Sequence, residues 1–229
     1  MLDALFSTHL AVLPVLLPAF TAFALLLIGD HGGDAQGSHG HRRLRWARAI
    51  AIGSASLGLV LAARLALQAD HGALEVYRVG DWPAPFGIVL VVDRLSALML
   101  LLSASVALPV LVYASGGWDA HGRHFHALFQ FQLMGLNGAF VTGDLFNLFV
   151  FFEVLLIASY VLMLHGQGRE RFKAGLHYVV LNLAASALFL IGVALIYALT
   201  GTLNFADLAL RVPRVEEPEA AVLQAAALI

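Results

Sequence analysis

The residue best suited to chemistry in this sequence is Glu153, a single carboxylate inside the apolar segment 145–164. In a helix that starts after Asp144, nine residues place Glu153 roughly 13–14 Å deeper. That depth is near the middle of a hydrocarbon core about 30 Å thick, where a charge costs at least ~2.5–3.5 kcal/mol. A carboxyl group in this setting can accept and release protons, so Glu153 is the candidate proton-binding residue. The alternative is a neutral glutamate that only holds helices together through hydrogen bonds.

Three further ionisable residues are candidates for a proton relay. His177 lies about one turn into the apolar segment 174–199, and histidine titrates near neutral pH; the alternative is an interfacial histidine bonded to a backbone carbonyl. Asp144 stands at a helix start, where the helix dipole accommodates a negative charge. Lys173 could stabilise an anionic Glu153, although a lysine in a short loop between helices is more often a topology signal.

Other polar residues in apolar segments predict helix packing. Asn137, Asn147 and Asn182 are expected to form hydrogen bonds between helices rather than to bind ions. Ser54 and Gly58 form a pair of small residues with three residues between them, which could seat a neighbouring helix closely.

No metal site or cofactor is expected. The histidines of segment 31–41 and of segment 121–126 lack a specific ligand spacing. The sequence contains no Walker loop, dinucleotide fingerprint, haem-ligand pair or nucleophile motif, and it has no cysteine. We therefore expect no enzyme active site in this chain.

The composition is that of an all-α integral membrane protein. Of the 229 residues, 60% are hydrophobic and 12% are charged, and the mean hydropathy is +0.85. Six spanning helices are expected, at residues 10–28, 49–67, 93–113, 126–141, 145–164 and 174–199. A short hairpin with strands at 74–79 and 86–92 is plausible between the second and third helices. Residues 220–229 start another apolar run too short to span, so the sequence is interpreted as truncated inside a seventh helix.

The distribution of basic residues predicts the orientation. If the N-terminus is outside, the inner loops hold eight arginines and lysines and the outer side holds five. Cytoplasmic loops carry the excess of such residues, which favours an outside N-terminus. The inner residues in this arrangement are Arg42, Arg43, Arg45, Arg48, Arg123, Arg169, Arg171 and Lys173.

Residues 142–166, TGDLFNLFVFFEVLLIASYVLMLHG, closely resemble the fifth-helix segment of the D-type subunit of the Mrp-type multisubunit Na⁺/H⁺ antiporter. Three further segments resemble the same family in the same order: YRVGDWPAPFGIVLVVDRLSALML, QLMGLNGAFVTGDLFNLF and AGLHYVVLNLAASALFLIGVALIYALTGTLNFADLA. Together they cover most of residues 77–209. The D-type subunit is related to the membrane-arm pump subunits of respiratory complex I and to hydrogenase-type membrane subunits.

The resemblance implies a fold of fourteen helices, in which two inverted five-helix repeats follow three leading helices. Residues 1–113 would then be the leading helices, and residues 114–229 the first part of the first repeat. The membrane glutamate of the family matches Glu153, and a family lysine or histidine early in the sixth helix corresponds best to His177. The family's partner lysine lies on a broken seventh helix that this sequence does not contain, so the chain is not expected to transport alone.

We therefore expect the N-terminal portion of a proton-translocating subunit of a monovalent cation (Na⁺)/H⁺ antiporter. It would be a multi-pass protein of the cell inner membrane whose partners are other antiporter subunits, and it would not bind nucleic acid. Approach of a cationic side chain would control proton binding at Glu153. The first alternative is a proton-pumping subunit of a complex I-like NADH-quinone oxidoreductase or a hydrogenase, and the second is a non-transporting membrane scaffold.

Overall fold

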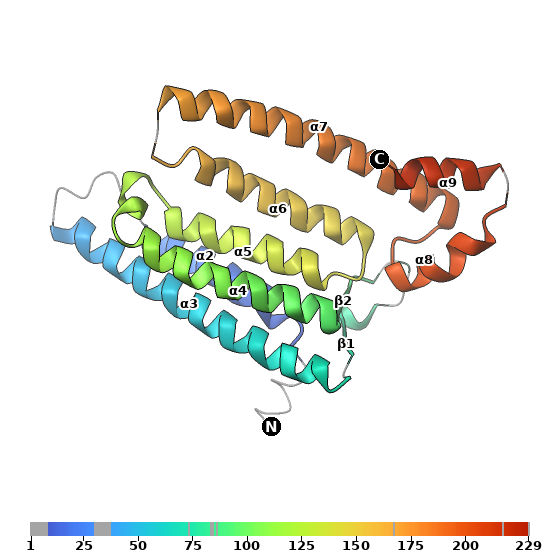
Figure 1. Ribbon diagram of the computed structural model, residues 1–229, viewed down its shortest axis with the longest axis horizontal. Helices are drawn as coiled ribbons and strands as arrows, with labels where there is room; N and C mark the ends of the chain where they lie inside the picture. Colours follow the sequence, from blue (N-terminus) through green and yellow to red (C-terminus); the bar gives the residue numbers. More distant parts are fainter. Residues whose placement is uncertain are drawn as a thin grey trace.

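A computed structural model gives the fold over residues 9–29, 38–72, 74–82, 85, 87–166, 168–216 and 218–228. Within these residues, long helices lie side by side in an elongated bundle (Figure 1). The long helices are α2 (Leu13–Ile28), α3 (Ser38–Asp70), α4 (Arg94–Ala114), α5 (Phe125–Val141), α6 (Leu145–Met163) and α7 (Arg169–Thr200). The predicted all-α membrane fold is confirmed. His31 and the segment around it lie outside the described residues.

Four of the described helices are long and apolar enough to cross a membrane, namely α3, α4, α6 and α7. The other two long helices are shorter, with 16 residues in α2 and 17 in α5. Helix α2 packs against α3 and α5, and α5 also packs against α4 and α6. Helix α5 thus contacts the helices before it as well as α6 after it.

Two helices begin earlier than the sequence predicts. Helix α3 starts at Ser38 instead of residue 49, and α7 starts at Arg169 instead of residue 174. The added turns are rich in arginine, which is a good helix former, whereas hydropathy detects only the part that can cross a bilayer. As a result Lys173 lies on a helix and not in a loop.

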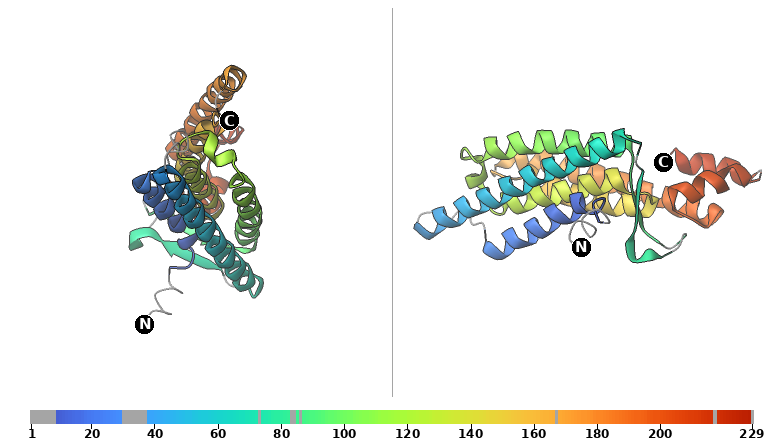
Figure 2. Two further views of the ribbon diagram at one scale, coloured as in Figure 1. Left: turned by 90° about the vertical axis from the view of Figure 1, so that its left-hand side faces the viewer. Right: turned by 90° about the horizontal axis from the view of Figure 1, so that it is seen from below.

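The predicted hairpin is present and lies across one end of the helices (Figure 2). Strand β1 (Glu75–Arg78) pairs antiparallel with β2 (Val89–Val92), and Glu75 is opposite Val92. We call this the hairpin end of the bundle. The opposite end carries the short turn Trp118–His121.

The turn between α5 and α6 is attached to the hairpin. The Gly143 N–H donates to the Val89 carbonyl over 2.7 Å, and Thr142 forms a β-bridge with Leu90. A second bridge joins Asp144 to Asn204, just before the short helix α8 (Phe205–Arg211). The start of α6 is therefore held from both sides by backbone hydrogen bonds.

The predicted start of a seventh helix corresponds to α9 (Glu219–Ala227), which packs against α7 near the end of the described chain (Figure 1).

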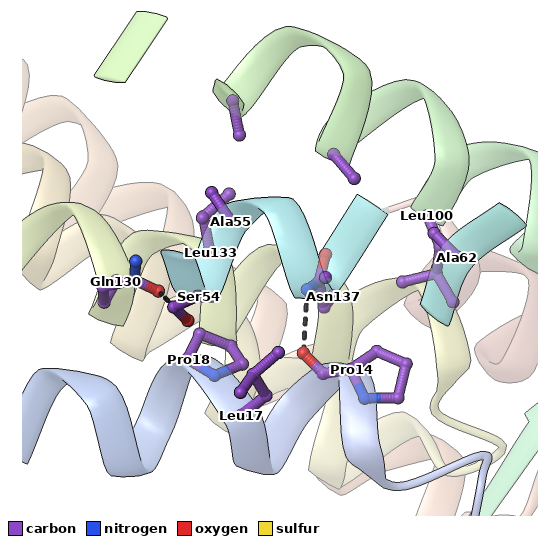
Figure 3. A pocket seen from close by; sticks show the side chains of 13 residues that line it. Pro14, Leu17, Pro18, Ser54, Ala55, Ala62, Leu100, Gln130, Leu133 and Asn137 are labelled. Carbon is purple, nitrogen blue, oxygen red and sulfur yellow. Dashed lines mark hydrogen bonds between the residues drawn. The ribbon is translucent and has the colours of Figure 1, made fainter. Parts of the chain in front are cut away.

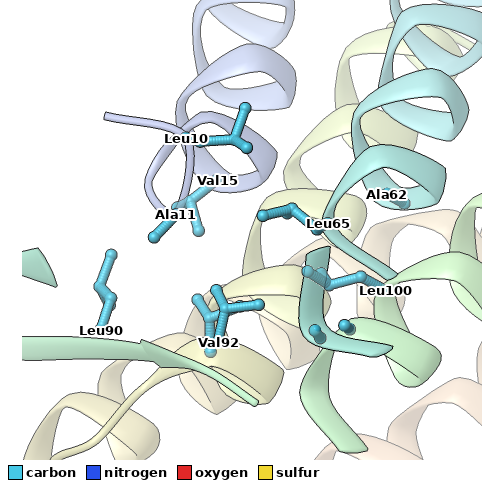
Figure 4. Close-up of a cluster of buried hydrophobic side chains, with 11 residues drawn as sticks. Leu10, Ala11, Val15, Ala62, Leu65, Leu90, Val92 and Leu100 are labelled. Carbon is cyan, nitrogen blue, oxygen red and sulfur yellow. The ribbon is translucent and has the colours of Figure 1, made fainter. Parts of the chain in front are cut away.

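A buried apolar cluster fills the bundle next to the hairpin (Figure 4). It joins α2, α3, α4, α5 and β2 through side chains that include Leu10, Val15, Leu65, Leu90, Val92 and Leu100. Burial of apolar surface stabilises the fold by roughly 25 cal/mol per Å². This cluster therefore holds the hairpin, and through it the α5–α6 turn, against the leading helices.

Helices α5 and α6 approach each other closely at two glycines of α5, where there is no room for a larger side chain. A Cβ added at Gly135 would lie 2.7 Å from the Leu155 backbone nitrogen and 2.8 Å from the Phe151 carbonyl oxygen. A Cβ at Gly138 would overlap the Phe151 ring. The two glycines thus set the distance between α5 and α6.

We predict that Gly135→Ala destabilises the full-length subunit by about 1–3 kcal/mol, because the added methyl meets backbone atoms that cannot rotate away. The measurement is the unfolding temperature in detergent. Gly53→Ala on α3 is the matched control, since a Cβ there has nothing within 4 Å. Equal unfolding temperatures for the two variants would contradict the close approach.

Candidate functional site

The predicted proton-binding residue, Glu153, lies on α6 and faces α7. Glu153 is half-buried in the middle of α6, and its Oε1 accepts a hydrogen bond from the Ser186 Oγ of α7. Ser186 is thirty-three residues away in the sequence, so the bond depends on the pairing of α6 with α7. A hydroxyl that donates to a carboxyl oxygen stabilises the ionised form and can turn to accept from the protonated form.

The surroundings of Glu153 are otherwise largely apolar. The carboxyl group borders a cavity of ≈ 260 Å³ between α6 and α7, whose other polar side chains are Asn182 and Ser186. Phe149 stacks on Phe189 with ring centroids 6.2 Å apart and an angle of 12° between the planes. Electrostatic interactions are stronger in such low-polarity surroundings, so a charged group that entered this cavity would act strongly on Glu153.

The structure does not bring His177 or Lys173 to Glu153. His177 is exposed, and its Nδ1 donates to the Lys173 carbonyl over 2.9 Å. A bond to a backbone carbonyl is what the alternative interpretation, an interfacial histidine without a relay role, predicts. Nine residues separate His177 from Ser186, which is roughly 13–14 Å along a helix. Lys173 is exposed near the start of α7, so the relay role of both residues stays a prediction.

Two tyrosine rings, one from α6 and one from α7, meet elsewhere along this helix pair. Tyr160 and Tyr178 meet edge to face with centroids 5.5 Å apart. The Tyr178 Oη lies 3.4 Å from the Ser159 Oγ, within hydrogen-bonding distance. Tyr178 and Ser186 were not among the predicted site residues. With Asn182 they recur every four residues along α7, and this spacing is the signal that could have found them.

Asp144 caps the start of α6, about 13–14 Å from Glu153 along the helix. It is buried, and its side chain accepts from the Asn147 N–H over 2.9 Å. Burial raises the pKa of Asp144 above its ordinary value, while hydrogen bonds from the backbone N–H groups of Asn147 and Phe146 act in the opposite direction. The Asn147 Nδ2 donates to the Thr142 Oγ1 over 3.0 Å. Asp144 and Asn147 therefore stabilise the α5–α6 turn.

The other two asparagines form different kinds of bond. The Asn137 Nδ2 donates to the Pro14 carbonyl on α2 over 2.8 Å. That carbonyl has no partner within its own helix, because the residue four positions on is Pro18, which lacks an N–H. The Asn182 Nδ2 donates to the Tyr178 carbonyl within α7. Asn137 thus joins two helices, whereas Asn182 presents an amide to the cavity beside Glu153.

Comparisons with known proteins match this chain to antiporter-type membrane subunits. Residues 142–229 match the family described as "NADH:quinone oxidoreductase/Mrp antiporter, TM". The chain is 53% identical over 211 residues to the D-type subunit of a probable K⁺/H⁺ antiporter of Rhizobium meliloti (strain 1021), covering 91% of this chain and 38% of the relative. The resemblance to the D-type antiporter subunit is confirmed.

Further matches support the resemblance. The D-type subunit of the Na⁺/H⁺ antiporter of Alkalihalophilus pseudofirmus is 41% identical over 91% of this chain and 40% of the relative. The solved Mrp complex of Dietzia sp. DQ12-45-1b contains a chain with a TM-score of 0.80 and 32% identity, over 96% of this chain and 40% of that chain. The chain therefore spans about two fifths of the length of these relatives.

At the opposite end of this antiporter-like bundle, a buried ion cluster joins three elements. Asp119 is fully buried and receives two hydrogen bonds from Arg48 of α3, Nε to Oδ2 at 2.6 Å and Nη2 to Oδ1 at 2.7 Å. The His126 Nε2 of α5 donates to Oδ2 over 2.9 Å. Burial by itself would raise the pKa of Asp119, but the hydrogen bonds and charges of Arg48 and His126 hold it below its ordinary value. Sequence reasoning did not single out Asp119, which lies in a glycine-rich loop without a motif.

The same turn holds the ends of α6 and α7. The His165 Nε2, just after α6, donates to the Trp118 carbonyl over 3.0 Å. The Arg171 guanidinium of α7 lies 4.8 Å from the centre of the Trp118 ring, and its Nη1 donates to the His165 carbonyl over 2.7 Å. The helix pair that carries Glu153 is therefore anchored at both ends.

We predict that Asp119→Asn destabilises the full-length subunit by about 3 kcal/mol at pH 7, since it leaves Arg48 without its carboxylate. The folded-state pKa of Asp119 lies below the unfolded value of about 3.9. The stabilisation is therefore complete above the unfolded pKa and is lost as the pH falls through the folded pKa.

The measurement is the difference in unfolding temperature between wild type and Asp119→Asn from pH 7 down to pH 4. A His126→Gln background keeps histidine titration out of the comparison. The difference should persist down to about pH 5, and a difference that shrinks between pH 7 and pH 5 would contradict the assignment.

Proposed function

We propose that this chain is the N-terminal portion of a proton-translocating subunit of a multisubunit monovalent cation/H⁺ antiporter, and that Glu153 binds the transported proton. The observation that carries the proposal is the Glu153 carboxyl in the middle of α6, with Ser186 as its hydrogen-bond donor and an apolar cavity beside it. Intramembrane carboxylates are costly and typically mark proton or ion pathways.

The cavity beside Glu153 supports control by a charged group. Its walls come from α6 and α7, and the chain spans only about two fifths of its relatives. A cationic side chain from the rest of the subunit would favour the ionised glutamate on approach and the protonated glutamate on withdrawal. This switch is the mechanism that we propose for proton binding and release.

The proposed cation is Na⁺ or K⁺, and the partners are other subunits of the antiporter. The relatives include one named as a probable K⁺/H⁺ antiporter subunit and one named as a Na⁺/H⁺ antiporter subunit. We further propose that the chain lies in the cell inner membrane with its N-terminus outside, because that topology places the larger group of basic residues inside. The hairpin end then faces outward, and the Asp119 cluster faces the cytoplasm.

A complex I-like proton pump is the alternative, because the matching family also includes NADH:quinone oxidoreductase subunits. The relatives named as antiporter subunits, at 53% and 41% identity, favour the antiporter.

We predict that Glu153→Gln in the full-length subunit abolishes cation/H⁺ exchange by the assembled complex, because the amide cannot bind a proton. Glu153→Asp should retain partial exchange, since it keeps the carboxyl group but shortens its reach towards Ser186. The measurement is proton flux driven by a cation gradient in membrane vesicles, normalised to the amount of assembled complex.

Glu170→Gln is the matched control, because it makes the same change at an exposed glutamate in the first turn of α7. Unchanged exchange in Glu153→Gln would contradict the proposal. A loss of assembly with normal exchange per assembled complex would support the scaffold alternative instead.

A further inference from the structure

A second group of buried polar side chains lies on the other side of α5, away from Glu153. It surrounds a cavity of ≈ 30 Å³ among α2, α3, α4 and α5 (Figure 3). Small side chains leave this space open, namely Ala55, Gly58 and Ala62 of α3 and Ala104 and Ala107 of α4. A Cβ at Gly58 would have nothing within 4 Å. The Ser54–Gly58 pair therefore does not seat a neighbouring helix at Gly58, as the sequence suggested, but opens a cavity.

Three polar side chains border the cavity, and their hydrogen bonds are incomplete. The Gln130 side chain is fully buried, and its Nε2 donates to the Ala51 carbonyl over 3.1 Å. The Gln130 Oε1 receives only a long bond of 3.4 Å from the Ser54 Oγ, which itself accepts from Thr21. Because a side-chain amide offers two N–H donors and two acceptor lone pairs, Gln130 keeps unused capacity in a buried position.

Asn137 borders the same cavity two helical turns further along α5. Its Nδ2 donates to Pro14 on α2, as Figure 3 shows, while Gln130 and Ser54 lie at the other end of the cavity. Seven residues separate Gln130 from Asn137, which is about 10.5 Å along the helix. This distance is too long for a direct hydrogen bond between the two amides.

We infer that this cavity is an internal water site, in which about two water molecules connect the Gln130–Ser54 pair to Asn137. One buried water needs roughly 10–15 Å³ of such space and two to four polar partners. Two waters joined by three hydrogen bonds of ~2.8 Å bridge about 8 Å, which matches the gap once the side chains reach towards each other. The site is separate from the Glu153 cavity, because α5 and α6 are in backbone contact between the two.

The polar row continues one turn towards the opposite end of the bundle. His126 is fully buried, and within the described residues its Nδ1 has no hydrogen-bond partner. A buried ring nitrogen without a partner is costly unless a water satisfies it. On the other side of the cavity, the apolar cluster of Figure 4 closes the row towards the hairpin. The polar row therefore ends at this cluster and does not run through the bundle to the hairpin.

The test is X-ray radiolytic labelling of the full-length subunit in its assembled complex, in which hydroxyl radicals formed from bound water oxidise the side chains next to it. Leu17 and Leu133 line the cavity. Leu102 lies on the exposed surface of α4, a helix apolar enough to cross a membrane, where it would face lipid and not water. Leu17 and Leu133 should be oxidised several-fold faster than Leu102, which faces away from the cavity.

Two substitutions at Gly58 of α3 test whether the labelling depends on water in this cavity or on water that reaches these leucines by another route. Gly58→Leu fills the cavity and should reduce labelling of Leu17 and Leu133 to the level of Leu102. Gly58→Ala, for which the structure has room, should reduce it partly and guards against a folding defect of the larger variant. Gly53→Ala is the matched control, because Gly53 also has nothing within 4 Å but does not line the cavity.

Faster labelling of Leu17 and Leu133 that falls in Gly58→Ala and not in Gly53→Ala would establish the water site. Labelling of Leu17 and Leu133 no faster than that of Leu102 would overturn it and show a dry cavity. Labelling that is equal in Gly58→Ala, Gly58→Leu and wild type would also overturn it, because the water would then lie elsewhere.

Discussion

The close contact between α5 and α6 is the constraint on which the rest of the structure depends. Gly135 and Gly138 bring the backbones together, and the short turn before Asp144 leaves α6 no freedom to slide along α5. The depth of Glu153 in the bundle follows directly from this register. A side chain at either glycine would move α6, and with it the carboxyl group, relative to Ser186 and the cavity of α7.

The ends of the α6–α7 pair are fixed by different kinds of interaction. At the hairpin end, backbone hydrogen bonds join β2, the α5–α6 turn and the start of α8. At the opposite end, ionic and aromatic contacts around Trp118 and Asp119 join α3, α5, α6 and α7. Between these two ends few strong polar bonds cross from α6 to α7, so the bond between Ser186 and Glu153 stands out in an otherwise apolar contact. Under the proposed mechanism, Glu153 would change its protonation without disturbing the anchors of its helix.

Much of the architecture could be predicted from the sequence, because apolar length and turn chemistry are local signals. The spanning segments, the hairpin and the position of Glu153 within its helix all follow from such signals. The contacts of the site could not be predicted, since they depend on which helix faces join. Ser186 and Asp119 carry no motif and become informative only through partners 33 and 71 residues away. The exposure of His177 depends in the same way on the rotation of α7 about its axis.

The central claim is that Glu153 changes protonation in contact with Ser186. The most direct measurement is an infrared difference spectrum of the assembled complex across a pH titration, which detects the C=O stretch of a protonated carboxyl group. The account predicts a band that is absent in Glu153→Gln, that shifts to higher frequency in Ser186→Ala because a hydrogen bond is lost, and that stays unchanged in Ser103→Ala, where the serine bonds only its own helix. A spectrum in which Glu153→Gln retains the complete carboxyl band of the wild type would contradict the account.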